Sequence, residues 1–405
     1  MCGIFGVYGE EGASERIYLG LHNLQHRGQE SAGIVSLDGN RFHQKKGMGI
    51  VNDVFNEDDL QNILKGNIAI GHVRYSTEGE SNGGNAQPFA GGEVAVAHNG
   101  EIANFIKLKK ELGAKGSSFW TGSDTEIFTK LLDRSNKGSL EEKVIEAANI
   151  MRPSYSLVIM GEGKLIGVRD VSGVRPLEIG KTENGYALSS ETVGFDIINA
   201  KPIRSVLPGE VVVFGSSVKS DEDFSSYKIE NSENHPRLHC IFEQIYLSRP
   251  DSLFSKDASI GMVRREFGRQ LYRESPVEAD LVIEVPDSSF DAAIGFSEEG
   301  NIRYDRGFHR NHYIGRTFIE PIQLTRDTMV LKKQNNDPFV VRDKRVVIVD
   351  DSIVRGTNIK KLVDFARNKG GASEVHVRIS SPPYMHSCYL GVDTKKESEL
   401  IAHNR

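Results

Sequence analysis

The chain from residue 345 to residue 358 reads Arg345-Val346-Val347-Ile348-Val349-Asp350-Asp351-Ser352-Ile353-Val354-Arg355-Gly356-Thr357-Asn358. Residues 346–349 form an uninterrupted β-branched run, which is typical of a strand covered on both faces of a parallel sheet. Apolar residues at positions 359, 362, 363 and 366 then recur at helix spacing. A strand, a short loop and a helix in this order predict half of a doubly wound α/β unit, whose ligands bind at the carboxyl ends of the strands.

The loop after this strand has residues suited to a phosphorylated sugar. Asp350 and Asp351 end the strand and could accept the two hydroxyls of a ribose or face a bound cation. Residues 352–357 then offer hydroxyls, backbone N–H groups and a glycine where a helix begins, which favours phosphate binding at a helix N-terminus. A Walker A loop is excluded because no Gly-Lys-Ser/Thr ending follows. The alternative is a charged strand-to-helix turn without a ligand.

Two blocks of sequence flank a polar stretch at residues 216–235 that has no apolar periodicity. The first block carries a helical pattern at 124–134 and short β-like runs, which predict stacked sheets flanked by helices. Its β-like runs are residues 3–8, 68–73, 94–97, 157–160, 165–168 and 211–214. The second block alternates helix with buried strand, with a helix face at Val263, Phe267 and Leu271 and a strand at 281–285. We expect two domains, residues 1–230 and 231–405.

Cys2 directly follows the initiator methionine. Methionine before a small side chain is normally removed, which leaves Cys2 with both a thiol and a free α-amine. The amine, with a reference pKa of about 7.7–8.0, can take the proton of a thiol whose reference pKa is about 8.5. One residue then supplies nucleophile and base, whereas retention of Met1 would remove the base. The alternative is a cysteine that happens to begin an N-terminal strand.

Three further segments match the needs of glutamine chemistry. Arg74 is a fork-shaped cation suited to a substrate carboxylate, and Asp124 could hold a substrate ammonium. Asn99 and Gly100 offer a side-chain amide donor and a backbone N–H for an oxyanion hole. Two have a plainer alternative: a structural ion pair for Arg74 and a hairpin turn for Asn99-Gly100. Ser123-Asp124 is also a helix N-cap signal, a role we expect alongside the functional one. Together with Cys2, they indicate a glutamine amidase.

Sequence motifs in the first block support the same assignment. Six motifs resemble the N-terminal-nucleophile class of glutamine amidotransferases: Cys2-Gly3-Ile4, Leu24-Gln25-His26-Arg27-Gly28-Gln29-Glu30-Ser31-Ala32-Gly33, residues 72–77, Asn85-Ala86-Gln87-Pro88-Phe89, His98-Asn99-Gly100-Glu101 and residues 123–126. The resemblance covers nearly all of residues 1–215. It implies an α+β fold of four layers, the αββα glutaminase domain.

The same resemblance assigns roles to single residues. Cys2 is implied as the nucleophile, Arg74 and Asp124 as the glutamine clamps, and Asn99 with Gly100 as the oxyanion hole. Attack of the thiolate on the glutamine amide would release ammonia and leave a glutamyl thioester, which water hydrolyses.

The 345–358 stretch looks like the phosphoribosyl pyrophosphate (PRPP) signature of type I phosphoribosyltransferases, which have an α/β fold with a parallel sheet. Three more segments match: Pro286-Asp287-Ser288-Ser289, Tyr313-Ile314-Gly315-Arg316-Thr317-Phe318 and Ser380-Ser381-Pro382-Pro383. By motif, Asp350 and Asp351 take the ribose and Mg²⁺ side, and Ser288 is a further magnesium-site residue. The resemblance implies 5-phosphate and PRPP contacts from Ser352, Ile353, Val354, Arg355, Gly356, Thr357 and Lys333.

The two halves in this order resemble the glutamine phosphoribosylpyrophosphate amidotransferase family from Cys2 to about residue 403. The resemblance implies that ammonia from glutamine crosses inside the protein and displaces pyrophosphate from PRPP. The product would be 5-phosphoribosylamine, in the first step of de novo purine nucleotide biosynthesis, with magnesium on the pyrophosphate oxygens. A homo-oligomer, commonly a tetramer, and feedback by purine nucleotides are also implied. The acid pair argues against glucosamine-phosphate and asparagine synthetases, and the remaining alternative is an inactive homologue that senses PRPP.

The mobile lid that the family places over PRPP departs from its usual pattern here. The matching stretch keeps Lys333, but Pro338 stands where an arginine is common and Asp337 adds negative charge. His312 also replaces a usual arginine, and its charge would depend on pH. These changes predict altered lid closure and altered PRPP affinity.

Cys240 and Cys388 match two of the four thiolate ligands in family members with an iron–sulfur cluster. The other two would lie beyond residue 405, so a 4Fe–4S cluster is expected only in a longer form. The chain accordingly looks shortened at its C-terminus. The alternative is that both cysteines are small buried hydrophobes.

Composition limits the compartment and the partners. Among 405 residues, 26% are charged, and the net charge of −6 argues against nucleic acid or an anionic membrane as the main partner. No apolar run approaches the ~20 residues of a membrane span, and no signal-peptide pattern follows Met1. Three cysteines cannot build a disulfide framework, so the sequence predicts a cytoplasmic protein.

Overall fold

The computed structural model describes residues 2–75, 82–215, 224–311, 334–392, 394 and 396–403. Contacts divide the chain into two units. Unit 1 is Met1–Cys240 with Cys388–Asp393, and unit 2 is Ile241–Ser387 with Thr394–Arg405. Unit 1 therefore includes a short segment from late in the chain. Among the described residues, no helix is both long enough and apolar enough to cross a membrane.

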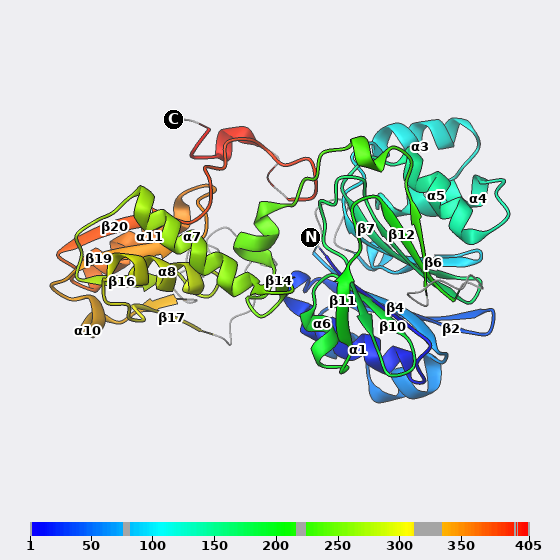
Figure 1. Cartoon of the computed structure of the whole chain (residues 1–405), viewed down its shortest axis with the longest axis horizontal. Helices are drawn as coiled ribbons and strands as arrows, with labels where there is room; N and C mark the ends of the chain where they lie inside the picture. Colours follow the sequence, from blue (N-terminus) through cyan, green and yellow to red (C-terminus); the bar gives the residue numbers. More distant parts are fainter. Residues whose placement is uncertain are drawn as a thin grey trace. The chain divides into compact units, whose positions relative to one another are not determined.

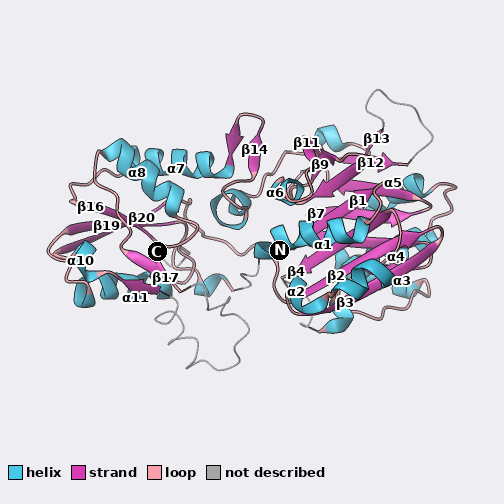
Figure 2. Cartoon of the chain, turned by 90° about the horizontal axis from the view of Figure 1, so that it is seen from below, coloured by secondary structure: helices cyan, strands magenta, loops and turns pink. Residues whose placement is uncertain are grey.

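Unit 1 is built on two stacked antiparallel sheets (Figure 2). In the described part of the chain, the larger sheet has seven strands in the order β11-β9-β10-β1-β4-β2-β3. Strand β1 lies inside this sheet, with Gly3 opposite Val73 and Phe5 opposite Ser189. The start of the chain is thereby held between two neighbours. The strands are β1 (Gly3–Tyr8), β2 (Ser31–Asp38), β3 (Arg41–Met48), β4 (Ile68–Arg74), β9 (Glu178–Lys181), β10 (Tyr186–Ser189) and β11 (Lys201–Ser205).

The second sheet has the strand order β13-β12-β8-β7-β6-β5. The two sheets approach closely at Gly6 and Gly167, where an added Cβ would lie 2.6 Å from Val158 and 2.8 Å from Leu188. Buried side chains of both sheets, among them Ile4 and Val158, form the core between them. The strands are β5 (Phe89–Gly91), β6 (Val94–Gly100), β7 (Tyr155–Gly161), β8 (Lys164–Arg169), β12 (Glu210–Phe214) and β13 (Ser225–Lys228).

Helices cover the outer face of each sheet (Figure 1). On the larger sheet, α1 (Ala13–Asn23) buries Ile17 and Leu21, together with α2 (Val51–Val54) and α6 (Val193–Asp196). On the smaller sheet, α3 (Phe105–Ala114), α4 (Thr125–Arg134) and α5 (Leu140–Ile150) enclose a separate apolar core. Three cores between four layers confirm the predicted αββα fold.

Unit 2 contains a parallel sheet in the order β16-β19-β20, with bounds Leu281–Glu284, Arg345–Asp350 and Glu374–Ile379. Alternate residues of β19 enter two different cores. Val346 and Ile348 pack on the side of α11 (Thr357–Asp364), whereas Val347 and Val349 pack on the side of α8 (Phe290–Gly300). The strand is covered on both faces, which confirms the prediction from its β-branched run.

Helix α7 (Ile260–Glu274) lies closely against α8. A Cβ on Gly268 would lie 1.9 Å from the carbonyl oxygen of Ala292, and one on Gly295 would lie 1.9 Å from that of Arg265. Only glycine permits this approach of the two backbones.

Short elements complete the described chain. Among its described residues, unit 2 also has two small antiparallel strand pairs, β14 (Leu253–Ser255) with β15 (Ala258–Ser259) and β17 (Phe308–Arg310) with β18 (Gln334–Asn336). It also has the short helix α10 (Pro338–Val341). Single helical turns lie at Gln25–Arg27, Asp59–Ile63, Gly83–Asn85, Ser232–Asn234, Glu243–Leu247, Phe365–Lys369 and Glu397–Glu399.

Candidate functional site

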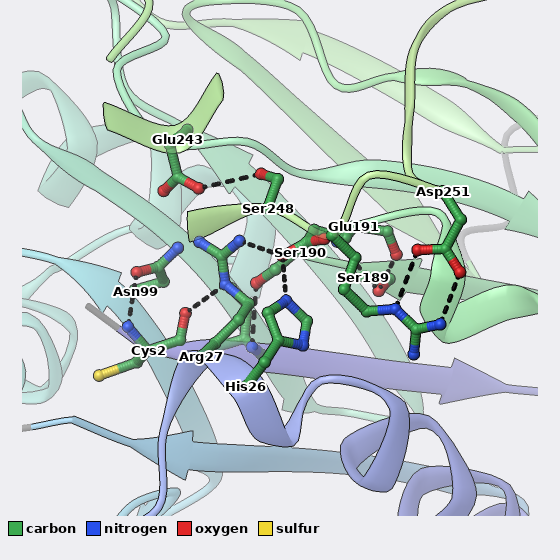
Figure 3. A network of polar contacts seen from close by, with 12 residues as sticks. Cys2, His26, Arg27, Asn99, Ser189, Ser190, Glu191, Glu243, Ser248 and Asp251 are labelled. Carbon is green, nitrogen blue, oxygen red and sulfur yellow. Dashed lines mark hydrogen bonds and ion pairs between the residues drawn. The ribbon is translucent and has the colours of Figure 1, made fainter. Parts of the chain in front are cut away.

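Cys2 lies at the entrance to β1, where the paired strands of the larger sheet end. Its backbone nitrogen donates a hydrogen bond to Asn99 Oδ1 at 3.1 Å, and its Sγ lies 3.7 Å from the carbonyl oxygen of Tyr75. Figure 3 shows the sulfur turned away from Arg27. The side chain is half-buried. The main chain of Cys2 is therefore anchored while its thiol stays separate from that anchor.

Asn99 is fully buried near the end of β6. Its Oδ1 accepts from Cys2, but its Nδ2 has no hydrogen-bond partner among the described residues. Gly100 follows with φ +140°, and a Cβ there would lie 2.3 Å from the carbonyl oxygen of Ser154. The chain then continues into α3, so the hairpin alternative is wrong. A buried amide donor without a partner beside a cysteine is the arrangement an oxyanion hole requires.

Asp124 contributes an ionised carboxylate beside the same strand end. Its Oδ2 accepts from the backbone nitrogen of Ile102 at 2.8 Å, and its Oδ1 lies 3.6 Å from His98 Nδ1. Burial alone would raise the pKa of Asp124, but His98 and the backbone hydrogen bonds hold that pKa below its ordinary value. The predicted N-cap of Ser123-Asp124 is confirmed in position, and Ser123 Oγ accepts from the Thr125 backbone nitrogen at 3.3 Å. Asp124 occupies the N-cap position of α4 without a side-chain cap bond, because its carboxylate is turned to Ile102 and His98.

A buried polar network joins four of the sequence motifs. His98 Nδ1 lies 3.0 Å from Thr125 Oγ1, Gln87 Nε2 donates to the same oxygen, and the His98 backbone nitrogen donates to Gln87 Oε1. His72 Nε2 lies 3.1 Å from the His98 carbonyl oxygen. Burial, together with the nearby charge of Arg74, lowers the pKa of His72 to about 3. Sequence reasoning quoted these motifs but gave His72, Gln87, His98 and Thr125 no role.

Arg74 is the last residue of β4 and lies at the end of this strand that is next to Cys2. Gly3 lies opposite Val73 in the antiparallel pair, so Cys2 and Arg74 flank the same end of that ladder. The Arg74 side chain is buried. A Cβ on Gly28 would lie 2.5 Å from the Arg74 carbonyl carbon, so the chain after Arg27 passes directly over this strand end.

Arg27 is a further site residue that sequence reasoning missed. Its guanidinium is fully buried, with Nε donating to the Cys2 carbonyl oxygen at 2.9 Å and Nη1 donating to Glu191 Oε1 at 2.5 Å (Figure 3). His26 Nε2 lies 2.7 Å from the same Glu191 oxygen. The sequence hinted at Arg27 only through its place in the 24–33 motif. It contained no indication that Glu191 would lie near Cys2.

The acid pair of unit 2 lies at the carboxyl end of β19 and is buried. Ser288 Oγ donates to Asp351 Oδ2 at 2.5 Å, and Ser289 Oγ donates to Asp350 Oδ1 at 3.2 Å. Burial, reinforced by the charge of Asp351, raises the pKa of Asp350 to about 8, and burial raises the pKa of Asp351 as well. Two crowded carboxylates with serine hydroxyls are hard oxygen donors, a set that fits Mg²⁺.

The loop after the acid pair ends where α11 begins. Gly356 is the N-cap residue with φ +75°, a left-handed conformation that favours glycine. Arg355 Nε donates to Glu399 Oε2 at 2.6 Å, and the Ile401 backbone nitrogen donates to the Val354 carbonyl oxygen at 3.0 Å. The predicted site residue Lys333, together with His312 and the 313–318 motif, lies outside the described residues.

Two residues that depart from the family lid begin a short helix. Asp337 Oδ1 accepts from the Phe339 backbone nitrogen at 2.9 Å and so caps α10, whose first residue is Pro338. Proline at the first helical position and aspartate at the N-cap are both favoured there. In this structure, Asp337 and Pro338 therefore serve to begin helix α10.

Cys240 and Cys388 lie in unit 1 beside the fully buried Arg175. Arg175 Nη1 lies 3.7 Å from Cys240 Sγ, and its Nη2 donates to the Leu390 carbonyl oxygen at 2.5 Å. The Leu390 backbone nitrogen donates to Cys388 Sγ at 3.3 Å. The sequence contains three cysteines in all, including Cys2. Cys240 and Cys388 by themselves supply two of the four thiolates that such a cluster needs.

Comparisons with known proteins match part of the chain in one case and nearly all of it in the others. A glutamine amidotransferase domain model matches residues 72–196. The chain is 43% identical to the amidophosphoribosyltransferase of Bacillus subtilis, with 99% of this chain and 83% of that protein covered. It is 44% identical to that of Archaeoglobus fulgidus, over 99% of this chain and 87% of the relative. A solved structure described as B. subtilis glutamine PRPP amidotransferase with ADP and GMP matches with a TM-score of 0.90, at 42% identity, covering 100% of this chain and 87% of that one.

Proposed function

The chain belongs to the amidophosphoribosyltransferase family, and from this we propose how its residues share the reaction. The enzyme hydrolyses glutamine and transfers the ammonia to PRPP, giving 5-phosphoribosylamine, glutamate and pyrophosphate. This is the first step of de novo purine nucleotide biosynthesis. For the residue roles, the main support is Asn99, whose amide holds the Cys2 nitrogen at one end and has no partner among the described residues at the other.

In the glutaminase half, Cys2 is the nucleophile once Met1 has been removed. Its α-amine takes the thiol proton, and the thiolate attacks the glutamine amide carbon. The hydrogen bond from the Cys2 nitrogen to Asn99 Oδ1 fixes the orientation of that amine. Asn99 Nδ2 and the Gly100 N–H stabilise the negative oxygen of the tetrahedral intermediate. Collapse of that intermediate releases ammonia and leaves a thioester, which water hydrolyses to glutamate.

Arg74 and Asp124 hold the amino-acid end of glutamine. The Arg74 fork suits the α-carboxylate. Asp124 suits the α-ammonium, because its lowered pKa keeps the carboxylate charged at neutral pH. The buried network around His98 holds Asp124 in place through the 3.6 Å contact to Oδ1.

In the transferase half, Asp350 and Asp351 face the ribose of PRPP, and residues 352–357 surround its 5-phosphate. Asp350, Asp351 and Ser288 would hold Mg²⁺, which when bound neutralises charge on the pyrophosphate oxygens. Arg355 is paired with Glu399 at an exposed position, and such a pair is worth only about 0–1 kcal/mol. A phosphate can therefore compete for this guanidinium. Lys333 is proposed as a further PRPP contact.

The wider context is proposed on the same basis. We assign residues 1–230 to the glutaminase domain and 231–405 to the phosphoribosyltransferase domain. We expect a cytoplasmic homo-oligomer, a tetramer by light scattering, that is inhibited by purine nucleotides. One solved relative is described as a complex with ADP and GMP, which supports nucleotide regulation of this chain.

The test separates the two half-reactions by changing Cys2 to Ala. With glutamine as the nitrogen donor, we expect Cys2→Ala to release neither glutamate nor PRPP-dependent pyrophosphate. With an ammonium salt in place of glutamine, the variant should still release pyrophosphate from PRPP and Mg²⁺. Persistent glutamate release would refute the nucleophile assignment. Loss of the ammonium-dependent reaction in a folded variant would refute the division of labour.

A further inference from the structure

Three side chains in unit 2 form a cluster that the proposed reaction does not use. His386 lies in the loop after β20, Glu397 begins the helical turn Glu397–Glu399, and His403 follows that turn. One donor atom from each lies within 4.8 Å of the other two. Two imidazoles and a carboxylate are the ligand set of open zinc sites, in which water takes the remaining position.

The Glu397 carboxylate lies between the two rings. His386 Nδ1 is 3.4 Å from Glu397 Oε1, and His403 Nε2 is 3.9 Å from Glu397 Oε2. Both separations exceed an ordinary hydrogen bond of about 2.7–3.2 Å. Ligands about 2.0–2.2 Å from a tetrahedral ion lie roughly 3.4 Å apart. The donor spacing therefore suits an ion between the groups better than direct pairing.

His403 is already oriented as a metal ligand. Its Nδ1 lies 2.9 Å from the Met385 carbonyl oxygen, which can only accept, and its Nε2 is the ring nitrogen on the side of Glu397, 3.9 Å from Oε2. Ligand histidines commonly donate their second ring N–H to a backbone carbonyl in this way. This contact is independent of the donor spacing, and it points to the same use of the ring.

We propose that His386, Glu397 and His403 bind a divalent transition-metal ion, with Zn²⁺ as the best match. Nitrogen donors distinguish this site from the all-oxygen set at Asp350 and Asp351, which suits Mg²⁺. The side chains are 75%, 41% and 36% exposed. An ion can therefore enter directly from solvent.

Occupancy of this site acts on the PRPP loop, a consequence that rests on the proposed function. The segment that carries Glu397 and His403 also provides Glu399, which pairs with Arg355, and Ile401, which donates to Val354. An ion that joins Glu397 and His403 to His386 restrains the segment from which Glu399 and Ile401 contact the PRPP loop. Bound metal therefore keeps Glu399 on Arg355, in competition with the 5-phosphate.

The first test is calorimetric titration of Zn²⁺ into the full chain in saturating Mg²⁺. A Cys2→Ser background removes the thiol–amine chelate at the N-terminus. We expect one ion per chain, with affinity at least about tenfold weaker in His403→Ala and in His386→Ala. The matched control is His376→Ala, because His376 lies 2.9 Å from Glu374 but belongs to no group of three such ligands among the described residues. Absence of saturable binding, or equal binding in all three variants, would overturn the site.

The second test measures the coupling without using activity. Amide hydrogen exchange of the peptide containing Ile401 should slow when Zn²⁺ is added, and it should be unaffected by Zn²⁺ in His403→Ala. Binding of one ion with unchanged exchange at Ile401 would overturn the link to the PRPP loop. Neither readout depends on turnover, so failure here is distinguishable from failure of the proposed reaction.

Discussion

At the scale of single residues, the glutaminase site depends on one amide used at both ends. Asn99 Oδ1 accepts from the Cys2 nitrogen, and Nδ2 has no partner among the described residues although the side chain is fully buried. A buried donor without a partner costs about 1–3 kcal/mol. That cost is recovered when a negatively charged oxygen forms beside it, which is how a preorganised oxyanion hole favours the transition state over the substrate.

We expect Asn99→Ala to lower kcat for glutamate release by about 100- to 1,000-fold, because the oxyanion donor is lost. The KM for glutamine should change only a few-fold, since Arg74 and Asp124 remain. Steady-state kinetics of glutamate release give both constants. Asn62→Ala is the control, because Asn62 is exposed and its side-chain amide donates to its near neighbour Asp58 at 2.7 Å, away from the proposed site residues. A kcat within tenfold of the parent would contradict the assignment.

At the scale of elements, close backbone approaches position both sites. Strand β19 places Asp350 at its carboxyl end. Helix α8 begins directly after Ser288 and Ser289, which contact the acid pair. Helix α8 is in turn held by α7 through Gly268 and Gly295. The glycines therefore support the acid pair indirectly, by fixing the helix that follows its serines.

We expect Gly268→Ala to destabilise the protein by roughly 1–3 kcal/mol, because its Cβ would lie 1.9 Å from the Ala292 carbonyl oxygen and push α7 from α8. Urea unfolding followed by circular dichroism measures the change. Gly113→Ala in α3 is the control: no atom lies within 4 Å of its added Cβ. That variant should be neutral or more stable by up to about 1 kcal/mol. Equal stability of the two variants would show that α7 and α8 can separate without cost.

The strand pair around His72 should make unit 1 sensitive to acid. The pKa of His72 is lowered from 6.5 to about 3 in the folded protein. Between those two pH values, only the unfolded state binds the proton at this histidine. The free energy of unfolding then falls as pH falls, by up to about 1.4 kcal/mol per pH unit. We expect His72→Gln to flatten this slope between pH 6 and pH 4. Urea titrations at several pH values measure it, and an unchanged slope would contradict the buried neutral state.

At the scale of the whole molecule, one chain carries two reactions that differ in whether they need a metal ion. The residues proposed for glutamine cleavage include no acid pair, whereas burial, reinforced by repulsion from Asp351, raises the pKa of Asp350 to about 8. A cation offsets that repulsion. The transferase half should therefore depend on Mg²⁺, and the glutaminase half should not.

We expect chelation of Mg²⁺ by EDTA to abolish pyrophosphate release from PRPP, because the charge on the leaving group is no longer neutralised. Glutamate release should fall only to the rate measured without PRPP. Parallel assays of glutamate and pyrophosphate, with Mg²⁺ restored as the control, test this. Pyrophosphate release that continues in EDTA would contradict the magnesium assignment.

Much of the local structure could be predicted because periodicity reports burial residue by residue. The run at 3–8 is β1, and the run at 346–349 lies within β19. The sequence motifs likewise predicted the correct family. The helix start at Ser123-Asp124 was also predictable, but the contacts of the Asp124 carboxylate with Ile102 and His98 were not, because no local pattern reveals those distant partners.

The chain itself specifies which residue types can act: a thiol behind Met1, an acid pair after a β-branched run, and a glycine wherever backbones nearly touch. It does not specify which distant groups meet. Asn99 reaches Cys2 because two sheets stack, and Arg27 meets Glu191 because β1 is inserted between β4 and β10. The physical reason is that periodicity encodes the face a residue occupies, whereas contact depends on strand order, register and sheet spacing, which the fold establishes as a whole.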